Sequence, residues 1–420
     1  MGLFLFFITS IQRRNEMKKT MIGMAALVML GGTVTFAHAG SATLEQELLN
    51  LIEQNKHLVQ RIQRLEEQVS RQAEKQAVAQ EIVEEESFLQ AINDHVELSG
   101  VVEVEAASWS VDDNGFFEDD DGSDVSLATV EIGLDAQLSD WSSAHLLLLY
   151  EEGEEDGHII VDEGTITLGN MDKFPLYLTA GKMYVPFGSF ESCMISDPLT
   201  LELGETNDSA VQIGFEAGGF YGSAYVFNGD INEAGEDDDI DTFGANLGYA
   251  MENDAMALDV GVDYISNIGD TDGLGDHLEE RLIAAPEEID DYVDGLSLHA
   301  VFSMGPFTLI GEYLTALDDF EAAEIAFDGD GAEPESWNIE AAFATELFSR
   351  ETTFALGYQG TDEAVDFGLP EELYIGAISM EIFDHTSLAF EYFHAEDYDT
   401  SDGGTDDDAD VVTMQLAVEF

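Results

Sequence analysis

The sequence predicts an all-β fold, a 16-stranded antiparallel transmembrane β-barrel, preceded by a short N-terminal α-helical coiled coil. Three observations lead to this prediction. From Val96 to the end of the chain, apolar and polar residues alternate with a period of two; the links between the alternating segments are short and long in turn; and Leu recurs at every seventh position ahead of them. Period two is typical of strands with one apolar face, and alternating short turns and long loops are the layout of outer-membrane barrels. We therefore divide the chain into residues 1–39, 40–95 and 96–420.

Residues 1–39 are interpreted as an upstream extension, residues 1–16, followed by a cleaved signal peptide. Residues 17–19 (Met-Lys-Lys) begin a basic region, residues 21–34 are apolar, and residues 37–39 (Ala-His-Ala) form a small-residue cleavage site. The apolar run is shorter than the ~20 residues of a spanning helix, which disfavours a retained membrane anchor. The prediction is an exported protein that is cut after Ala39.

Residues 40–95 are predicted to form a periplasmic coiled coil and a linker. Residues 43–72 carry four heptads, and an Asn at an a position is a common device for fixing register and oligomer state. The core positions of this heptad are Leu44, Leu48, Leu51, Asn55, Leu58, Ile62, Leu65 and Val69. We expect a homo-oligomer and favour a trimer, although Asn55 suits a dimer as well. The alternative is a helix whose apolar stripe packs against its own barrel.

The barrel strands follow from the alternation. They are predicted at residues 96–108, 125–138, 143–151, 159–168, 174–185, 209–218, 220–228, 242–251, 255–266, 296–304, 306–317, 336–347, 351–360, 373–382, 385–396 and 410–420. Many have the ~10 residues that a tilted strand needs to cross a bilayer. The last one alternates up to a C-terminal Phe420, which resembles the terminal recognition signal of bacterial outer-membrane barrels. The prediction is the outer membrane of a Gram-negative bacterium, with outer-membrane lipid around the barrel.

Charge and composition exclude several classes of function. The chain has 13 Lys+Arg against 89 Asp+Glu, so it would repel nucleic acid. A single Cys and scattered His give no disulfide framework, metal-ligand spacing or catalytic motif, so we expect no enzyme, no cofactor and no dedicated metal site. Acidic loop clusters such as residues 237–239 either hold divalent cations loosely or form a solvated, salt-adapted surface.

The predicted lumen is acidic. Only four basic residues, Lys173, Lys182, Arg281 and Arg350, follow residue 95. The polar strand faces carry the predicted pore-lining residues Glu103, Glu105, Glu131, Asp135, Glu216, Asp259, Asp263, Glu312, Glu340 and Glu391. Any one of them could instead be a charge on the outer rim. Pores lined by carboxylates favour cations over anions, so we expect cation preference.

The third long link, residues 186–206, is less acidic than the others and is predicted to fold into the barrel as a constriction loop. Its candidate residues are Pro186, Phe187, Phe190, Asp197, Pro198, Leu199 and Glu205. The two prolines would stiffen it, and its apolar residues suggest packing against the barrel wall. The alternatives are a lid over the outer rim or a contact between subunits.

Residues 185–188 (Val-Pro-Phe-Gly) and 197–206 (Asp-Pro-Leu-Thr-Leu-Glu-Leu-Gly-Glu-Thr) closely resemble a loop pattern of the LbtU-like (legiobactin-uptake) siderophore porin family. The resemblance covers nearly the whole mature chain, and this loop is its specific part. It implies passive uptake of a small-molecule solute, a ferric siderophore or another metal chelate, through a barrel without a plug domain. The alternatives are a general cation-preferring diffusion porin, or a structural tether between the outer membrane and the periplasm.

Overall fold

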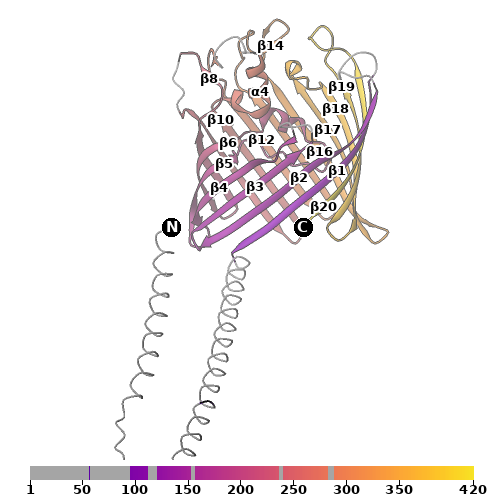
Figure 1. Cartoon of the computed structure of the whole chain (residues 1–420). Coiled ribbons are helices and arrows are strands. Elements are labelled where there is room, and N and C mark those ends of the chain that lie inside the picture. The colour runs from indigo at the N-terminus through magenta and orange to yellow at the C-terminus, as the bar shows by residue number, and fades with distance from the viewer. Residues whose placement is uncertain (1–55, 57–94, 112–120, 153–156, 236–239, 282–287) are drawn as a thin grey trace, which may run out of the picture. The chain divides into compact units, whose positions relative to one another are not determined.

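The structure is a computed structural model, and it describes residues 56, 95–111, 121–152, 157–235, 240–281 and 288–420. Sixteen strands form a closed barrel in which every neighbouring pair is antiparallel (Figure 1). In barrel order the strands are β1 (Val96–Val111), β2 (Gly122–Ser139), β3 (Ser142–Glu151), β4 (Ile160–Asn170), β5 (Phe174–Tyr184), β6 (Asn207–Ala217), β7 (Phe220–Phe227), β9 (Thr242–Asn253), β10 (Met256–Ile265), β12 (Gly295–Met304), β13 (Phe307–Ala316), β16 (Glu335–Leu347), β17 (Arg350–Asp362), β18 (Glu372–Phe383), β19 (Thr386–Glu396) and β20 (Asp408–Glu419). Each predicted strand agrees with one of these to within three residues at either end, so the 16-stranded antiparallel barrel is confirmed. The coiled coil of residues 43–72 lies outside the described residues, apart from residue 56, and stays a prediction.

The barrel closes where the last strand meets the first. Strand β20 pairs with β1 from Val101 opposite Glu419 to Val111 opposite Ala409. The backbones of Gly100 and Phe420 exchange two hydrogen bonds of 3.0 Å. The barrel sheet therefore has no open edge, which is the condition for a sheet in a lipid environment.

The wall has an apolar outer face and a more polar inner face. On β20, Val412, Leu416 and Val418 are exposed, while Thr413 and Ala417 between them are buried. The same alternation recurs around the ring, as the strand periodicity requires. Among the described residues, no helix is long and apolar enough to cross a membrane.

The connections differ at the two ends. Turns of two or three residues follow β2, β4, β6, β9, β12, β16 and β18, and the other connections between successive barrel strands are longer. Gly218 and Gly219 both have positive φ, as a two-residue hairpin turn between β6 and β7 requires. The longer links hold the remaining elements: α3 (Leu199–Gly204), β8 (Asn232–Glu233), η3 (Ile268–Asp270), α4 (Asp272–Arg281), β11 (Glu288–Ile289), β14 (Ala326–Phe327), β15 (Asp330–Gly331) and η4 (Val365–Phe367).

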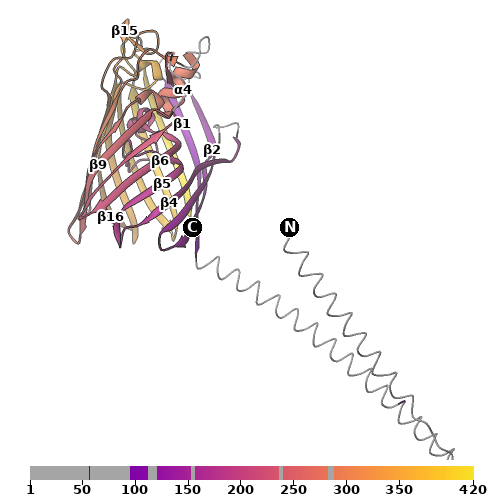
Figure 2. The same cartoon turned by 90° about the vertical axis from the view of Figure 1, so that its left-hand side faces the viewer.

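The long loops fold over one side of the barrel mouth. Helix α4 and the short strands β8, β14 and β15 gather at the end of the barrel away from the short turns (Figures 1 and 2). Leu274 of α4 and the loop residues Ile268 and Phe320 share a buried apolar core with inward residues of the wall such as Phe227. The core members come from β5, β6, β7, β10 and β13 and from the loops that follow β5, β7, β10, β13 and β17, so this side of the mouth is filled by packed side chains.

Candidate channel constriction

Residues 185–206, which connect β5 to β6, lie inside the barrel. Phe187 is fully buried and packs in the apolar core together with Leu203 of α3. Leu199 belongs to a second buried cluster with Leu373 and Ile375 of β18. The loop therefore leaves β5, crosses the interior and packs against strands on the other side of the ring.

Hydrogen bonds fix the first half of this loop to β10 and β13. Asp263 on β10 accepts the Gly188 N–H at 3.3 Å. Glu312 on β13 accepts the Ser189 N–H at 2.6 Å and the Phe190 N–H at 3.1 Å, one on each carboxylate oxygen. The same carboxylate also accepts the hydroxyl of Thr200 at 2.8 Å, which ties the start of the loop to α3.

The second half is held in the same way by β16, β17 and β19. Glu340 accepts the Ser192 hydroxyl and the Cys193 N–H, both at 2.8 Å. Glu391 accepts the backbone N–H groups of Ile195 and Ser196 and the Ser196 hydroxyl. The side-chain oxygen of Gln359 on β17 accepts the Leu199 N–H at 2.9 Å.

These four carboxylates are almost completely enclosed. The exposed fractions are 2% for Asp263, 5% for Glu312, 1% for Glu340 and 3% for Glu391. A buried carboxylate is stable only when its oxygens are paired, and here backbone N–H and hydroxyl donors of the loop provide much of that pairing. The four side chains point inward, where they anchor the loop rather than face an open channel.

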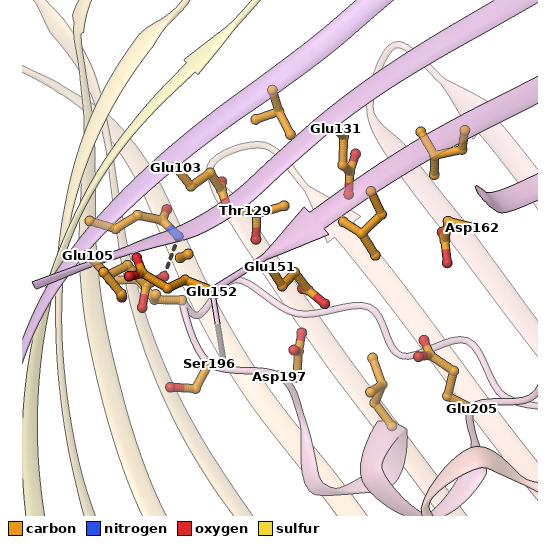
Figure 3. Close-up of a pocket in the computed structure, with 18 of the residues that line it drawn as sticks. Glu103, Glu105, Thr129, Glu131, Glu151, Glu152, Asp162, Ser196, Asp197 and Glu205 are labelled. Carbon is orange, nitrogen blue, oxygen red and sulfur yellow. Dashed lines mark hydrogen bonds between the residues drawn. The ribbon is translucent and has the colours of Figure 1, made fainter. Parts of the chain in front are cut away.

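The open space lies on the other side of the loop. A cavity of about 910 Å³ separates the loop from β1–β5. In Figure 3, Asp197 and Glu205 of the loop lie on one side of it, and Glu103 and Glu131 of the wall lie on the other. Its lining carboxylates are Glu103, Glu105, Glu131, Glu151, Glu152, Asp162, Asp197, Glu202 and Glu205. Within the described part of the chain, no Lys, Arg or His lines this cavity.

Several of these carboxylates accept hydrogen bonds from neighbouring residues. The Gln415 amide donates to Glu105 at 2.9 Å, and the Tyr184 hydroxyl donates to Asp162 at 3.0 Å. Burial raises the pKa of Glu205 to about 8, and the carboxylates of Asp272 and Asp197 add to this. The partly desolvated position of Asp197 raises its pKa, and the Glu105 carboxylate contributes further. Burial, together with neighbouring negative charge, thus makes Glu205 and Asp197 hold protons more tightly than water-exposed carboxylates do.

The remaining predicted pore-lining residues lie closer to the short turns. A hydrogen bond of 2.8 Å joins Asp135 Oδ1 to His145 Nδ1. Asp135 also lines a smaller cavity with His95 and Glu97. Glu216 and Asp259 line another small cavity beside the turn at residues 218–219. Strand parity places all ten predicted residues on the inner face, but only Glu103, Glu105 and Glu131 belong to the constriction cavity.

The predicted loop residues are divided between packing and lining. Phe187 and Leu199 are buried, Phe190 packs against the edge of the apolar core, and Asp197 and Glu205 line the cavity. Pro186 is separated from the end of β5 by Val185, and Pro198 is the residue before α3. Proline is well suited to that position because a helix start does not need its missing N–H.

Sequence reasoning missed part of the cavity wall. Glu151, Glu152, Asp162 and Glu202 line it but were not among the candidates. Asp162 could have been found, since it is an acidic residue within the strand predicted at residues 159–168. Leu147 and Leu149 of β3 also line the cavity; their signal is a run of four Leu, residues 146–149, that breaks the alternation.

No family model matches the chain. Its homologues include UPF0422 proteins: one of Coxiella burnetii is 28% identical over 280 residues, covering 65% of this chain and 59% of that protein. One of Legionella pneumophila is 28% identical over 362 residues, covering 77% of this chain and 66% of that protein. The matched part of the chain therefore spans about three fifths to two thirds of the length of these relatives.

Solved outer-membrane proteins share the fold. The outer membrane channel DcaP of Acinetobacter baumannii has a TM-score of 0.54 at 13% identity, over 77% of this chain and 97% of that one. OprB of Pseudomonas putida has a TM-score of 0.55 at 10% identity, over 79% of this chain and 96% of that one. The chain is thus a homologue of UPF0422 proteins of Coxiella and Legionella, with the barrel fold of outer-membrane porins.

Proposed function

We propose that the protein is a passive, cation-preferring channel of the outer membrane, with residues 185–206 as its filter. The observation behind this proposal is the cavity between that loop and β1–β5, which has nine lining carboxylates and no basic residue among the described residues. Charges in a narrow, partly desolvated passage act more strongly than in bulk water. A cation entering it would be attracted from both sides, and an anion would be repelled.

The solute is proposed to be a cationic or neutral metal chelate, such as a ferric siderophore. The loop pattern at residues 185–188 and 197–206, which resembles the LbtU-like siderophore porins, supports this choice. The negative charge of the cavity excludes anionic chelates from this proposal, because they would meet repulsion at the constriction. A general cation-preferring diffusion porin is the second candidate, and the size of the cavity, about 910 Å³, favours it for small solutes.

The decisive measurement is the ion preference of the purified full-length protein in planar bilayers. We expect a reversal potential that shows K⁺ passing over Cl⁻, more strongly at low salt because screening weakens on dilution. The variant Glu103→Gln/Glu131→Gln should reduce this preference, since both carboxylates line the constriction. The matched control Glu216→Gln removes an inward carboxylate outside that cavity and should change it less. Anion preference in the unmodified protein would refute the proposal.

We also infer that residues 43–72 join copies of the chain, most favourably three, through the heptad positions. The support is the sequence repeat, which gives each Leu at heptad position d a partner in a neighbouring helix; these residues are Leu44, Leu51, Leu58 and Leu65. Leu51→Asp/Leu58→Asp should abolish cross-linked oligomers of the full chain in membranes while the pore stays conductive. Cross-linked oligomers that persist in this variant would rule out the coil as the contact.

A further inference from the structure

Strand β3 contains an exception to the rule that governs the rest of the wall. Residues 146–149 are four consecutive leucines. Leu146 and Leu148 pair with Leu134 and Ile132 on the apolar outer face of the wall. Because side chains alternate along a strand, Leu147 and Leu149 point inward, and both line the constriction cavity. A polar lumen does not require them, so their position calls for a partner.

The two leucines are not isolated inside the cavity. Val101 of β1 and the loop residues Ile195 and Leu201 line it too. All five of these apolar side chains are partly exposed rather than packed away, and they come from both the wall and the loop. The cavity therefore combines apolar side chains with nine carboxylates.

We propose that the constriction selects organic cations that carry an apolar group. This rests on the proposed function, which it deepens from charge to chemical class. The carboxylates attract the ammonium or other cationic centre, while Leu147, Leu149 and their neighbours cover the apolar part of the solute. Transfer of apolar surface out of water favours such a solute over an equally charged hydrophilic one. A bare inorganic cation gains only the electrostatic part.

Two probes of equal charge and similar size separate the two contributions. Benzyltrimethylammonium has an apolar ring, and tris(2-hydroxyethyl)methylammonium has hydroxyl groups instead. In planar bilayers with the full-length protein, we expect benzyltrimethylammonium to half-block the K⁺ current at about tenfold lower concentration, an effect that follows from burying part of the ring. Equal half-blocking concentrations in the unmodified protein would overturn the inference.

Matched variants of one strand test where the discrimination resides. Leu147→Ala/Leu149→Ala removes apolar surface from the cavity, and it should bring the two half-blocking concentrations close together. Leu146→Ala/Leu148→Ala makes the same change on the outer face and should keep the difference. A difference that survives the first variant would place the apolar contact elsewhere and overturn the inference. Loss of K⁺ preference in the unmodified protein would instead refute the underlying channel proposal.

Discussion

Glu340 is the residue on which the centre of the constriction loop depends. It is 1% exposed, and it receives the Cys193 N–H and the Ser192 hydroxyl at 2.8 Å each. Asn338 on the same strand donates to it at 3.1 Å. A side chain so placed converts three neutral donors into charge-assisted hydrogen bonds, and its removal would leave a buried backbone N–H without a partner.

Glu340→Gln is expected to loosen this part of the loop, at a cost of about 1–3 kcal/mol in the free energy of unfolding. The native Cys193 reports on it, since burial raises the pKa of its thiol and the Glu340 charge raises it further. The variant should therefore react faster with a maleimide, because more thiolate forms and the loop opens. Glu346→Gln, on the same strand but outside these contacts, is the control. Unchanged labelling in both variants would show that Glu340 does not hold the loop.

Glu205 should make ion preference depend on pH. Burial raises its pKa to about 8, so its side chain is mostly neutral at pH 6 and charged at pH 9. We expect K⁺ preference to increase as pH rises through about 8, and Glu205→Gln to remove that step. The stability effect has the opposite direction: the folded chain binds this proton more tightly than the unfolded chain, so the stabilisation is full below about pH 4.5 and is lost as pH rises through about 8. Reversal potentials from pH 6 to 9 that do not change in the unmodified protein would contradict this assignment.

At the scale of elements, the connection between β5 and β6 is unlike the other long links. It contributes Phe187 and Leu203 to the apolar core, and its cited hydrogen bonds come from the five strands β10, β13, β16, β17 and β19. Its position therefore follows from packing and hydrogen bonds together. These contacts leave an opening between the loop and β1–β5.

Deleting Ser189 to Leu203 should widen that opening. Single-channel conductance should increase, and discrimination between small ions and bulky chelates should disappear, because the loop side of the cavity is removed. The charge variant Glu103→Gln/Glu131→Gln is the comparison: it should alter ion preference and leave conductance nearly the same. Unchanged conductance after the deletion would mean that the loop does not limit the pore.

The elements also show how far the sequence can be interpreted. The strands could be predicted because their period of two is a local property, and the bounds of β7, β10 and β18 follow from it to within one residue. The anchoring role of Glu312 and Glu340 could not, because their partners in the loop lie more than a hundred residues away along the chain. Alternation says that these side chains point inward; it does not say what they meet there.

At the scale of the whole molecule, the two ends of the barrel should face different compartments. The short turns lie at the end of the barrel where the C-terminus lies, and the long loops lie at the opposite end (Figure 1). In a Cys193→Ser background, Asp407→Cys in the last long loop should react with a membrane-impermeant thiol reagent on intact cells. Asp254→Cys in a short turn should react only after the outer membrane is permeabilised. The reverse pattern would invert the topology.

The anchoring of the loop has a consequence for assembly. Its partners Glu312, Glu340 and Glu391 follow Ser189, Cys193 and Ile195 by 123, 147 and 196 residues in the chain. Contacts over such separations form late, because the intervening chain must first be ordered. The first six strands can thus be paired while the loop between β5 and β6 still lacks its final position. Selectivity is then acquired in the last stage of folding, when β19 arrives and β20 joins β1, so a chain stalled before that stage would be an unfiltered opening rather than a narrower channel.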